Sequence, residues 1–135
     1  MISEDVLKEA FPEVDPGVHP LGTRVLVQIR LVKSKTSAGI LLHTDTKDFN
    51  KVNTQLGRVL RVGPISFRNR ETGQLWPEGI WAKPGDYIRL PRYGGDRFER
   101  AMPDSEDKVL FAIFQDHEII AKVDPEAFED LDEIL

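Results

Sequence analysis

The chain has 135 residues and no cysteine, which excludes a disulfide scaffold, a thiolate zinc site and a thiol nucleophile. Hydrophobic residues make up 40% and charged residues 30%, a balance typical of a soluble globular domain rather than a disordered one. The net charge of −5 is unevenly spread, because acidic residues gather at both ends and leave a mildly basic body. A dedicated nucleic-acid binder usually carries a strong basic stripe. The charge distribution of this chain therefore does not favour a dedicated nucleic-acid binder.

The first part of the chain predicts a helix, a linker and a strand, in that order. Ser3 is a suitable N-cap, and apolar residues fall on one side of a short helix over residues 3–11. Prolines and a glycine interrupt residues 12–20, which indicates an extended linker. Residues 23–30 alternate apolar and polar side chains, so we expect a half-buried strand whose polar side chains face solvent.

A long polar segment over residues 33–56 follows, and the apolar triplet Ile40, Leu41 and Leu42 interrupts it. Alone, the triplet would fit a buried strand. A core strand rarely lies between two polar arms of this length, however, and long loops in compact domains are usually functional or disordered. The segment therefore predicts a mobile loop that carries a hydrophobic clip.

The rest of the chain predicts further short strands, which at near-regular spacing indicate a small barrel or sandwich. They are expected at residues 57–63, 87–90, 108–114 and 119–123. A turn signal at residues 69–73 indicates a hairpin over residues 64–79. Residues 124–135 begin with Asp-Pro, carry six acidic residues and have one apolar face, which predicts a short amphipathic helix.

The order of these parts resembles the GroES-type co-chaperonins, the chaperonin-10 family, over about residues 18–123. The most specific part of the resemblance is the apolar triplet after Ala38 and Gly39. The pattern Gly-x-Val-Leu-x-Val-Gly follows it at residues 57–63. A Lys-Pro-Gly-Asp turn at residues 83–86 comes later, also in the order that the family shows.

The resemblance implies an all-β fold, a small irregular GroES-like β-barrel with a long mobile loop, a roof-like β-hairpin and short terminal extensions. Residues 18–123 would form the barrel domain, with the mobile loop at residues 33–56 and the roof hairpin at residues 64–79. Residues 1–17 and 124–135 would be the extensions. Such extensions, and a longer stretch after the apolar triplet, are similar to the co-chaperonins that bacteriophages encode.

The same resemblance implies a function, the capping of a GroEL-type chaperonin ring in its ATP-bound state with a folding client protein enclosed. The subunits would form a homo-oligomeric ring, expected to be a heptamer. No cofactor is expected in the lid, because the chaperonin binds and hydrolyses the ATP. The residues expected to bind the chaperonin are Gly39, Ile40, Leu41 and Leu42. The residues expected around the central hole of the roof are Phe67, Arg68, Asn69, Arg70 and Glu71. An ordinary surface hairpin would fit these last residues as well.

Neither an enzyme nor a metal site is expected. The sequence lacks a nucleophile elbow, a P-loop and a dinucleotide-binding glycine pattern. Its three histidines are spread over different elements, without the spacing of a zinc site. No apolar run approaches the roughly 18 residues of a membrane span, and no signal peptide is visible. We therefore expect no membrane partner and a cytoplasmic protein, in the host cytoplasm if a phage encodes it.

The alternative function is a nucleic-acid-binding barrel of the OB or SH3-like type, although the resemblance predicts no nucleic-acid partner. Such modules interleave exposed aromatic side chains with basic ones. The candidate aromatic residues are Phe67, Tyr93 and Phe98. The candidate basic residues are Arg58, Arg61, Arg68, Arg70, Arg89, Arg92, Arg97 and Arg100. A third hypothesis is a virion or scaffold protein that assembles without a chaperonin.

Overall fold

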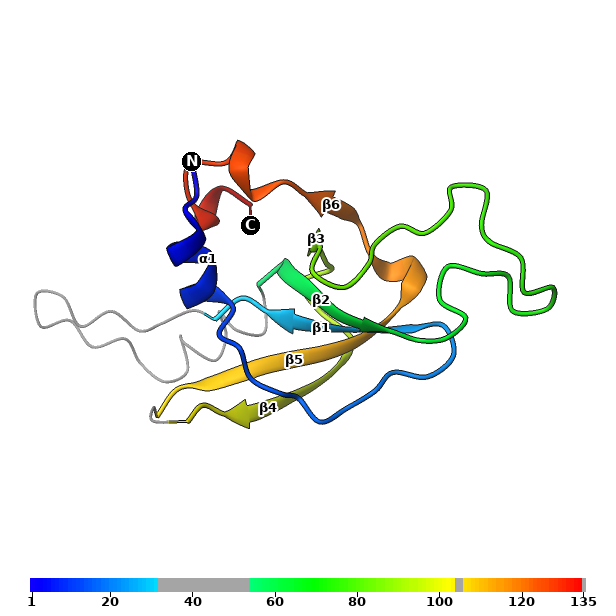
Figure 1. Cartoon of the computed structure of the whole chain (residues 1–135), viewed down its shortest axis with the longest axis horizontal. Helices are drawn as coiled ribbons and strands as arrows, with labels where there is room; N and C mark the ends of the chain where they lie inside the picture. Colours follow the sequence, from blue (N-terminus) through cyan, green and yellow to red (C-terminus); the bar gives the residue numbers. More distant parts are fainter. Residues whose placement is uncertain (32–53, 104–105, 135) are drawn as a thin grey trace, which may run out of the picture.

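The computed structural model describes residues 1–31, 54–103 and 106–134. These residues form one antiparallel sheet of six strands, with one short α-helix beside it (Figure 1). The strands are β1 (Arg24–Ile29), β2 (Leu56–Val62), β3 (Tyr87–Arg89), β4 (Asp96–Ala101), β5 (Lys108–Gln115) and β6 (Ala121–Val123). Their order in the sheet is β4-β5-β1-β2-β3-β6. The all-β class predicted from the sequence is therefore confirmed.

The helical elements are short and lie mostly near the chain ends. They are α1 (Glu4–Ala10) and the 3-10 helices η2 (Asp116–Glu118), η3 (Pro125–Ala127) and η4 (Leu131–Ile134). The predicted N-terminal helix is confirmed as α1, and the Ser3 hydroxyl caps it by accepting a hydrogen bond from Val6 N at 3.3 Å. Within the described part of the chain, no helix is long and apolar enough to cross a membrane.

The main core lies on one face of the sheet and draws on four of its strands. Val25, Val27 and Ile29 of β1 are fully buried in it, together with residues of β2, β3 and β5. The segment between β2 and β3 covers this core with Phe67, and Trp76 and Trp81 pack against it. This face of the sheet therefore carries the largest of the apolar clusters that the described residues form.

The second face of β1 is also buried, which corrects the prediction of a half-buried strand. Leu26 is fully buried and has Val14 of the linker packed against its cluster. Gln28 is 2% exposed, and its Nε2 donates to Pro12 O at 2.7 Å. Arg30 is 6% exposed. Alternation in the sequence identified the core face correctly, but it could not show that the linker would cover the polar face.

The strand β4 was not predicted. Its sequence is charged at four of six positions and lacks the alternation typical of a half-buried strand. Pairing with β5 creates it, with Phe98 opposite Phe111 and their rings stacked at 5.5 Å between centroids. The Arg100 guanidinium lies over the Phe98 ring at 4.7 Å, so this edge strand is held by aromatic contacts on a mostly polar sequence.

The prediction of one amphipathic helix over residues 124–135 is wrong. The described part of this segment makes two separate 3-10 turns, η3 and η4, with Phe128 extended between them. Ile134 is buried in a cluster that also contains residues of α1, and Phe128 packs against that cluster. Tertiary packing of these apolar side chains therefore overrides the local preference for a continuous helix.

Candidate functional site

The residues predicted to bind a chaperonin, Gly39, Ile40, Leu41 and Leu42, lie outside the described residues. Their role stays a prediction. The structure does describe where the chain enters and leaves the segment between β1 and β2. We call Arg30, Leu31 and residues 54–56 the loop root.

Backbone hydrogen bonds hold the two sides of the loop root together. Arg30 N donates to Leu56 O at 3.1 Å, which continues the antiparallel pairing of β1 and β2 to the end of the sheet. Gln55 makes two bonds with Leu90, because Leu90 N donates to Gln55 O at 2.7 Å and Gln55 Nε2 donates to Leu90 O at 3.1 Å. Both sides of the segment are therefore anchored on the same part of the sheet.

The predicted hairpin over residues 64–79 is present as an excursion with a single bridge, between Arg68 and Leu75. Its tip is organised by Asn69, whose Oδ1 accepts from Glu71 N at 2.8 Å and from Thr72 N at 3.1 Å. Arg68 Nη1 donates to Gly73 O at 2.9 Å across the turn. Figure 1 shows this segment (green) projecting from the end of the sheet opposite α1.

Phe67 is a core residue, which corrects its expected place around a central hole. It lies at the base of the hairpin with 1% of its surface exposed. Its ring meets Trp76 edge to face at 5.5 Å and Trp81 at 6.4 Å. The other four residues expected in the roof lie at the tip, where Asn69, Arg70 and Glu71 are exposed and Arg68 is partly so. Their role in a roof stays a prediction.

Asp116 is a structural residue that the sequence did not reveal. It is 2% exposed, and its Oδ2 accepts from Phe67 N at 2.8 Å. Its Oδ1 accepts from His117 N at 2.8 Å, and its own N donates to Thr23 O at 3.0 Å. Phe67 lies outside the strands with a left-handed φ of 62°, and its buried amide needs this side-chain acceptor. Asp116 therefore fixes the base of the hairpin.

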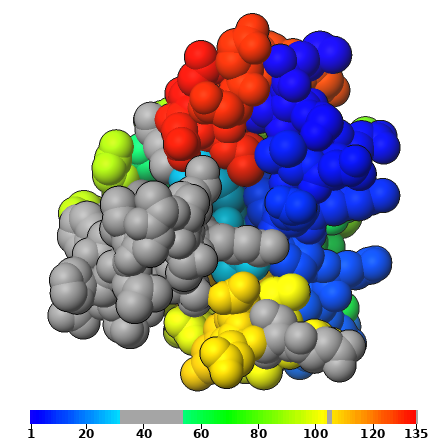
Figure 2. All heavy atoms as spheres, turned by 90° about the vertical axis from the view of Figure 1, so that its left-hand side faces the viewer, coloured from blue at the N-terminus to red at the C-terminus, as the bar shows by residue number. Residues whose placement is uncertain are grey.

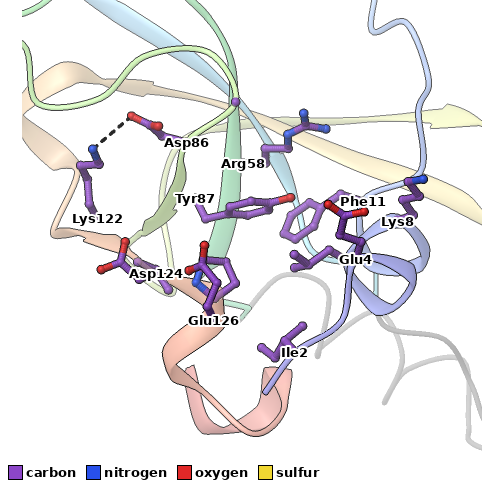
Figure 3. A pocket seen from close by; sticks show the side chains of 14 residues that line it. Ile2, Glu4, Lys8, Phe11, Arg58, Asp86, Tyr87, Lys122, Asp124 and Glu126 are labelled. Carbon is purple, nitrogen blue, oxygen red and sulfur yellow. Dashed lines mark ion pairs between the residues drawn. The ribbon is translucent and has the colours of Figure 1, made fainter.

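A groove of about 600 Å³ opens between α1, β3 and the C-terminal extension (Figure 3). Phe11 and Tyr87 line it, with their ring centroids 5.3 Å apart, and Arg58 lies 6.0 Å from the Tyr87 ring. At its rim Lys122 pairs with Asp86 at 3.5 Å. Charges of both signs surround the groove, and Arg58, a candidate for the nucleic-acid patch, is among the residues that line it. Among the described residues, no group of three or more histidines and carboxylates could hold a metal ion.

Five of the eight arginines proposed for a nucleic-acid patch donate hydrogen bonds within the chain. Those that donate to backbone carbonyl oxygens are Arg61, Arg68, Arg89, Arg97 and Arg100. Burial also lowers the pKa of Arg97. Of the candidate aromatic residues, Tyr93 is exposed, whereas Phe67 is in the core and Phe98 stacks on Phe111. These bonds give several of the arginines a structural role.

Comparison with known proteins identifies the class of protein that this fold defines. Residues 17–123 match the family described as Chaperonin 10 Kd subunit. The chain therefore belongs to the chaperonin 10 family of co-chaperonins, and the resemblance inferred from its sequence is confirmed.

Three relatives illustrate the similarity. The chain is 33% identical to the mitochondrial 10 kDa heat shock protein of Saccharomyces cerevisiae over 107 residues, which cover 79% of this chain and 89% of the yeast protein. It is 35% identical to the co-chaperonin GroES of Thermus thermophilus over 100 residues, 74% of this chain and 88% of the relative. It is 40% identical to the mitochondrial 10 kDa chaperonin of Arabidopsis thaliana over 76 residues, 56% and 68% of the two chains.

The family match leaves residues 1–16 and 124–135 outside it. These ranges nearly coincide with the two terminal extensions, which resemble those of phage-encoded co-chaperonins. The three relatives described above come from a fungus, a bacterium and a plant. The phage-like origin of the extensions therefore stays a prediction.

Proposed function

We propose that this chain is a lid subunit that caps a chaperonin ring in its ATP-bound state and encloses a folding client protein. Membership of the co-chaperonin family supports this proposal. The observation that carries it is the loop root, where the bond from Arg30 N to Leu56 O joins the two ends of the segment that holds the hydrophobic clip. A segment anchored in this way can present its middle residues to a partner while the sheet stays intact.

The binding step rests on Gly39, Ile40, Leu41 and Leu42. Full burial of three aliphatic side chains stabilises a complex by roughly 5–9 kcal/mol. Ordering the polar arms costs about 1–2 kcal/mol for each residue whose backbone becomes fixed. One segment therefore binds weakly and reversibly. Several segments on one ring bind tightly, because every contact after the first is intramolecular.

Assembly completes the proposal. Subunits form a homo-oligomeric ring, a heptamer in keeping with the family resemblance, and the exposed hairpin tips with Arg68, Asn69, Arg70 and Glu71 surround its axis. The lid itself carries no catalytic site and no cofactor, since the chaperonin binds and hydrolyses the ATP. We place this activity in the cytoplasm.

The test is co-sedimentation with a purified chaperonin, with and without ATP. The proposal predicts a complex that forms with ATP and is lost when nucleotide is omitted. A parallel assay measures binding to single-stranded DNA and tests the alternative function. A nucleic-acid-binding barrel would be retained on the DNA in a salt-sensitive way. Retention on DNA together with no ATP-dependent chaperonin complex would contradict the proposal.

A further inference from the structure

The two terminal extensions pack against each other, although they come from opposite ends of the chain. Met1 N pairs with Glu129 at 3.2 Å, and Ile2 N donates to Phe128 O at 3.1 Å. Figure 2 shows the extensions (blue and red) occupying adjoining areas of one face. Their apolar residues and three residues of the sheet form one cluster: Ile2, Leu7, Ala10, Phe11, Leu56, Tyr87, Val123, Phe128, Leu131 and Ile134.

Both extensions reach the loop root. From the N-terminal extension, Ala10 O accepts from Leu31 N at 2.7 Å. From the C-terminal extension, Asp132 Oδ1 pairs with Arg30 Nη1 at 3.3 Å. Leu56, on the other side of the root, is fully buried within the shared cluster. The extensions thus contact the chain on both sides of the segment between β1 and β2.

A second chain of contacts runs from the C-terminal extension through the sheet to the root. Arg89 Nη1 donates to Ile134 O, and its Nη2 donates to Gln55 Oε1 at 3.1 Å. Gln55 is itself bonded to Leu90, as described above. The carbonyl of Ile134 is therefore linked through Arg89 to Gln55 of the root.

Arg30 is buried at the loop root although its ion-pair partner is exposed. Its side chain is only 7% exposed, whereas that of Asp132 is 87% exposed. Burial lowers the pKa of Arg30, and Asp132 acts in the opposite direction. An exposed partner gives little ion-pair stabilisation, and burial of a guanidinium is unfavourable. The ion pair therefore contributes little to docking of the extension, and the apolar cluster supplies most of it.

We propose that the two extensions act as a clasp on the loop root, with Arg30, Gln55 and Arg89 as its positioning residues. Its effect on partner binding rests on the proposed function. Each root residue that is ordered before binding no longer has to be ordered in the complex. For each such residue the binding constant is about tenfold higher. The clasp therefore raises the affinity of the segment for the chaperonin without contacting the chaperonin.

The experiment removes residues 131–135 and measures amide exchange in the free protein. We expect the amides of Arg30, Leu31 and Leu90 to exchange about tenfold faster, because their bonds lie at the root. The amides that bond β4 to β5 report on the overall fold, and their exchange rates should not change. The matched control is Glu129→Gln, which alters the same extension at its contact with Met1 and should leave the root unchanged.

A second variant, Ile134→Asp, detaches the extension without shortening the chain, because it places a charge at a buried position. It keeps the test decisive if the truncated chain fails to fold. Each variant is also assayed for ATP-dependent chaperonin binding, which should weaken by about tenfold or more once several subunits contribute.

The outcomes separate the clasp from the proposed function. Unchanged exchange at the root in both variants would overturn the clasp. Faster exchange with undiminished chaperonin affinity would overturn its positioning role. If the intact chain bound no chaperonin, the proposed function would fail, whereas the exchange measurement would still decide whether the clasp exists.

Discussion

The hairpin and the loop root lie at opposite ends of the sheet and are stabilised in different ways. The hairpin tip depends on neighbours in sequence, since Asn69 bonds to residues two and three positions further on. The loop root depends on distant segments, since Leu31 bonds to Ala10 and Arg30 pairs with Asp132. Local contacts of the first kind leave a signature in the sequence, whereas contacts of the second kind appear only in the folded chain.

The largest expected effect concerns the segment between the two sides of the root. Replacement of Leu41 by Asp should abolish chaperonin capping and leave the fold intact, because a charge would have to enter an apolar site on the partner. ATP-dependent co-sedimentation measures the effect, and circular dichroism checks the fold. The matched control is Leu21→Asp, which changes an exposed leucine of the described chain and should retain capping. An unfolded Leu41→Asp variant would show that the triplet is structural.

At the hairpin base, Asp116→Ala should be the most destabilising change. It leaves the buried Phe67 amide without an acceptor, which costs about 1–3 kcal/mol. Each kcal/mol lowers the Tm of a domain of this size by roughly 4 °C. Thermal unfolding followed by near-ultraviolet circular dichroism is a suitable measurement, because Trp76 and Trp81 lie 4.8 Å apart beside Phe67.

Asp116→Asn provides the matched control for this change, since its single amide oxygen can still accept from Phe67 N, whereas its amide nitrogen cannot accept from His117 N. It should recover part of the lost stability. Equal destabilisation by both variants would contradict the view that the bond to Phe67 N is the main contribution of Asp116.

At the hairpin tip, Asn69→Ala should have a smaller effect. The two bonds that its side chain accepts are exposed, so their loss should cost about 0.5–1.5 kcal/mol in the stability of the turn. Faster amide exchange at Glu71 and Thr72 would report it. Exchange at the loop root should remain as it is. A simultaneous change at the root would show that the two ends of the molecule are coupled.

The smallest expected effect concerns Asp15, in the linker between α1 and β1. The hydrogen bond from Gly17 N, followed by the Arg61 guanidinium, lowers the pKa of this carboxyl below its ordinary value of 3.8. Its ionised form is therefore favoured in the folded state. It adds stability above pH 3.8 that is lost as the pH falls through the lowered pKa. Asp15→Asn should reduce the stability slightly at pH 7, and the difference should vanish in acid. A constant difference across this range would contradict the assignment.

Much of the fold could be predicted because its determinants are local. The alternation of Val25, Val27 and Ile29 placed β1 correctly on the main core, and Ser3 marked the start of α1. The hairpin turn was visible in the residues around Asn69. These patterns follow from backbone geometry over a few residues, so they do not depend on what packs against them.

The remaining features depend on contacts between distant residues. Gln28 and Arg30 were predicted to face solvent, because nothing nearby in the sequence shows that Gln28 bonds to the linker or that Arg30 pairs with the C-terminal extension. Asp116 follows β5 and carries no pattern that would distinguish a buried acceptor from a residue in a surface turn. The strand β4 exists because β5 offers an edge to pair with. Sequence periodicity cannot supply such information, because it describes one segment at a time.

The most direct test of the proposed lid function is an amide-exchange footprint of the chain with a chaperonin and ATP. We expect protection to increase in peptides covering residues 39–42 and exchange at the hairpin tip, residues 69–73, to stay as it is in the free ring. No footprint is expected when ATP is omitted. Protection at the hairpin instead of at residues 39–42, or no change at either end, would contradict the claim that this segment joins the lid to its partner.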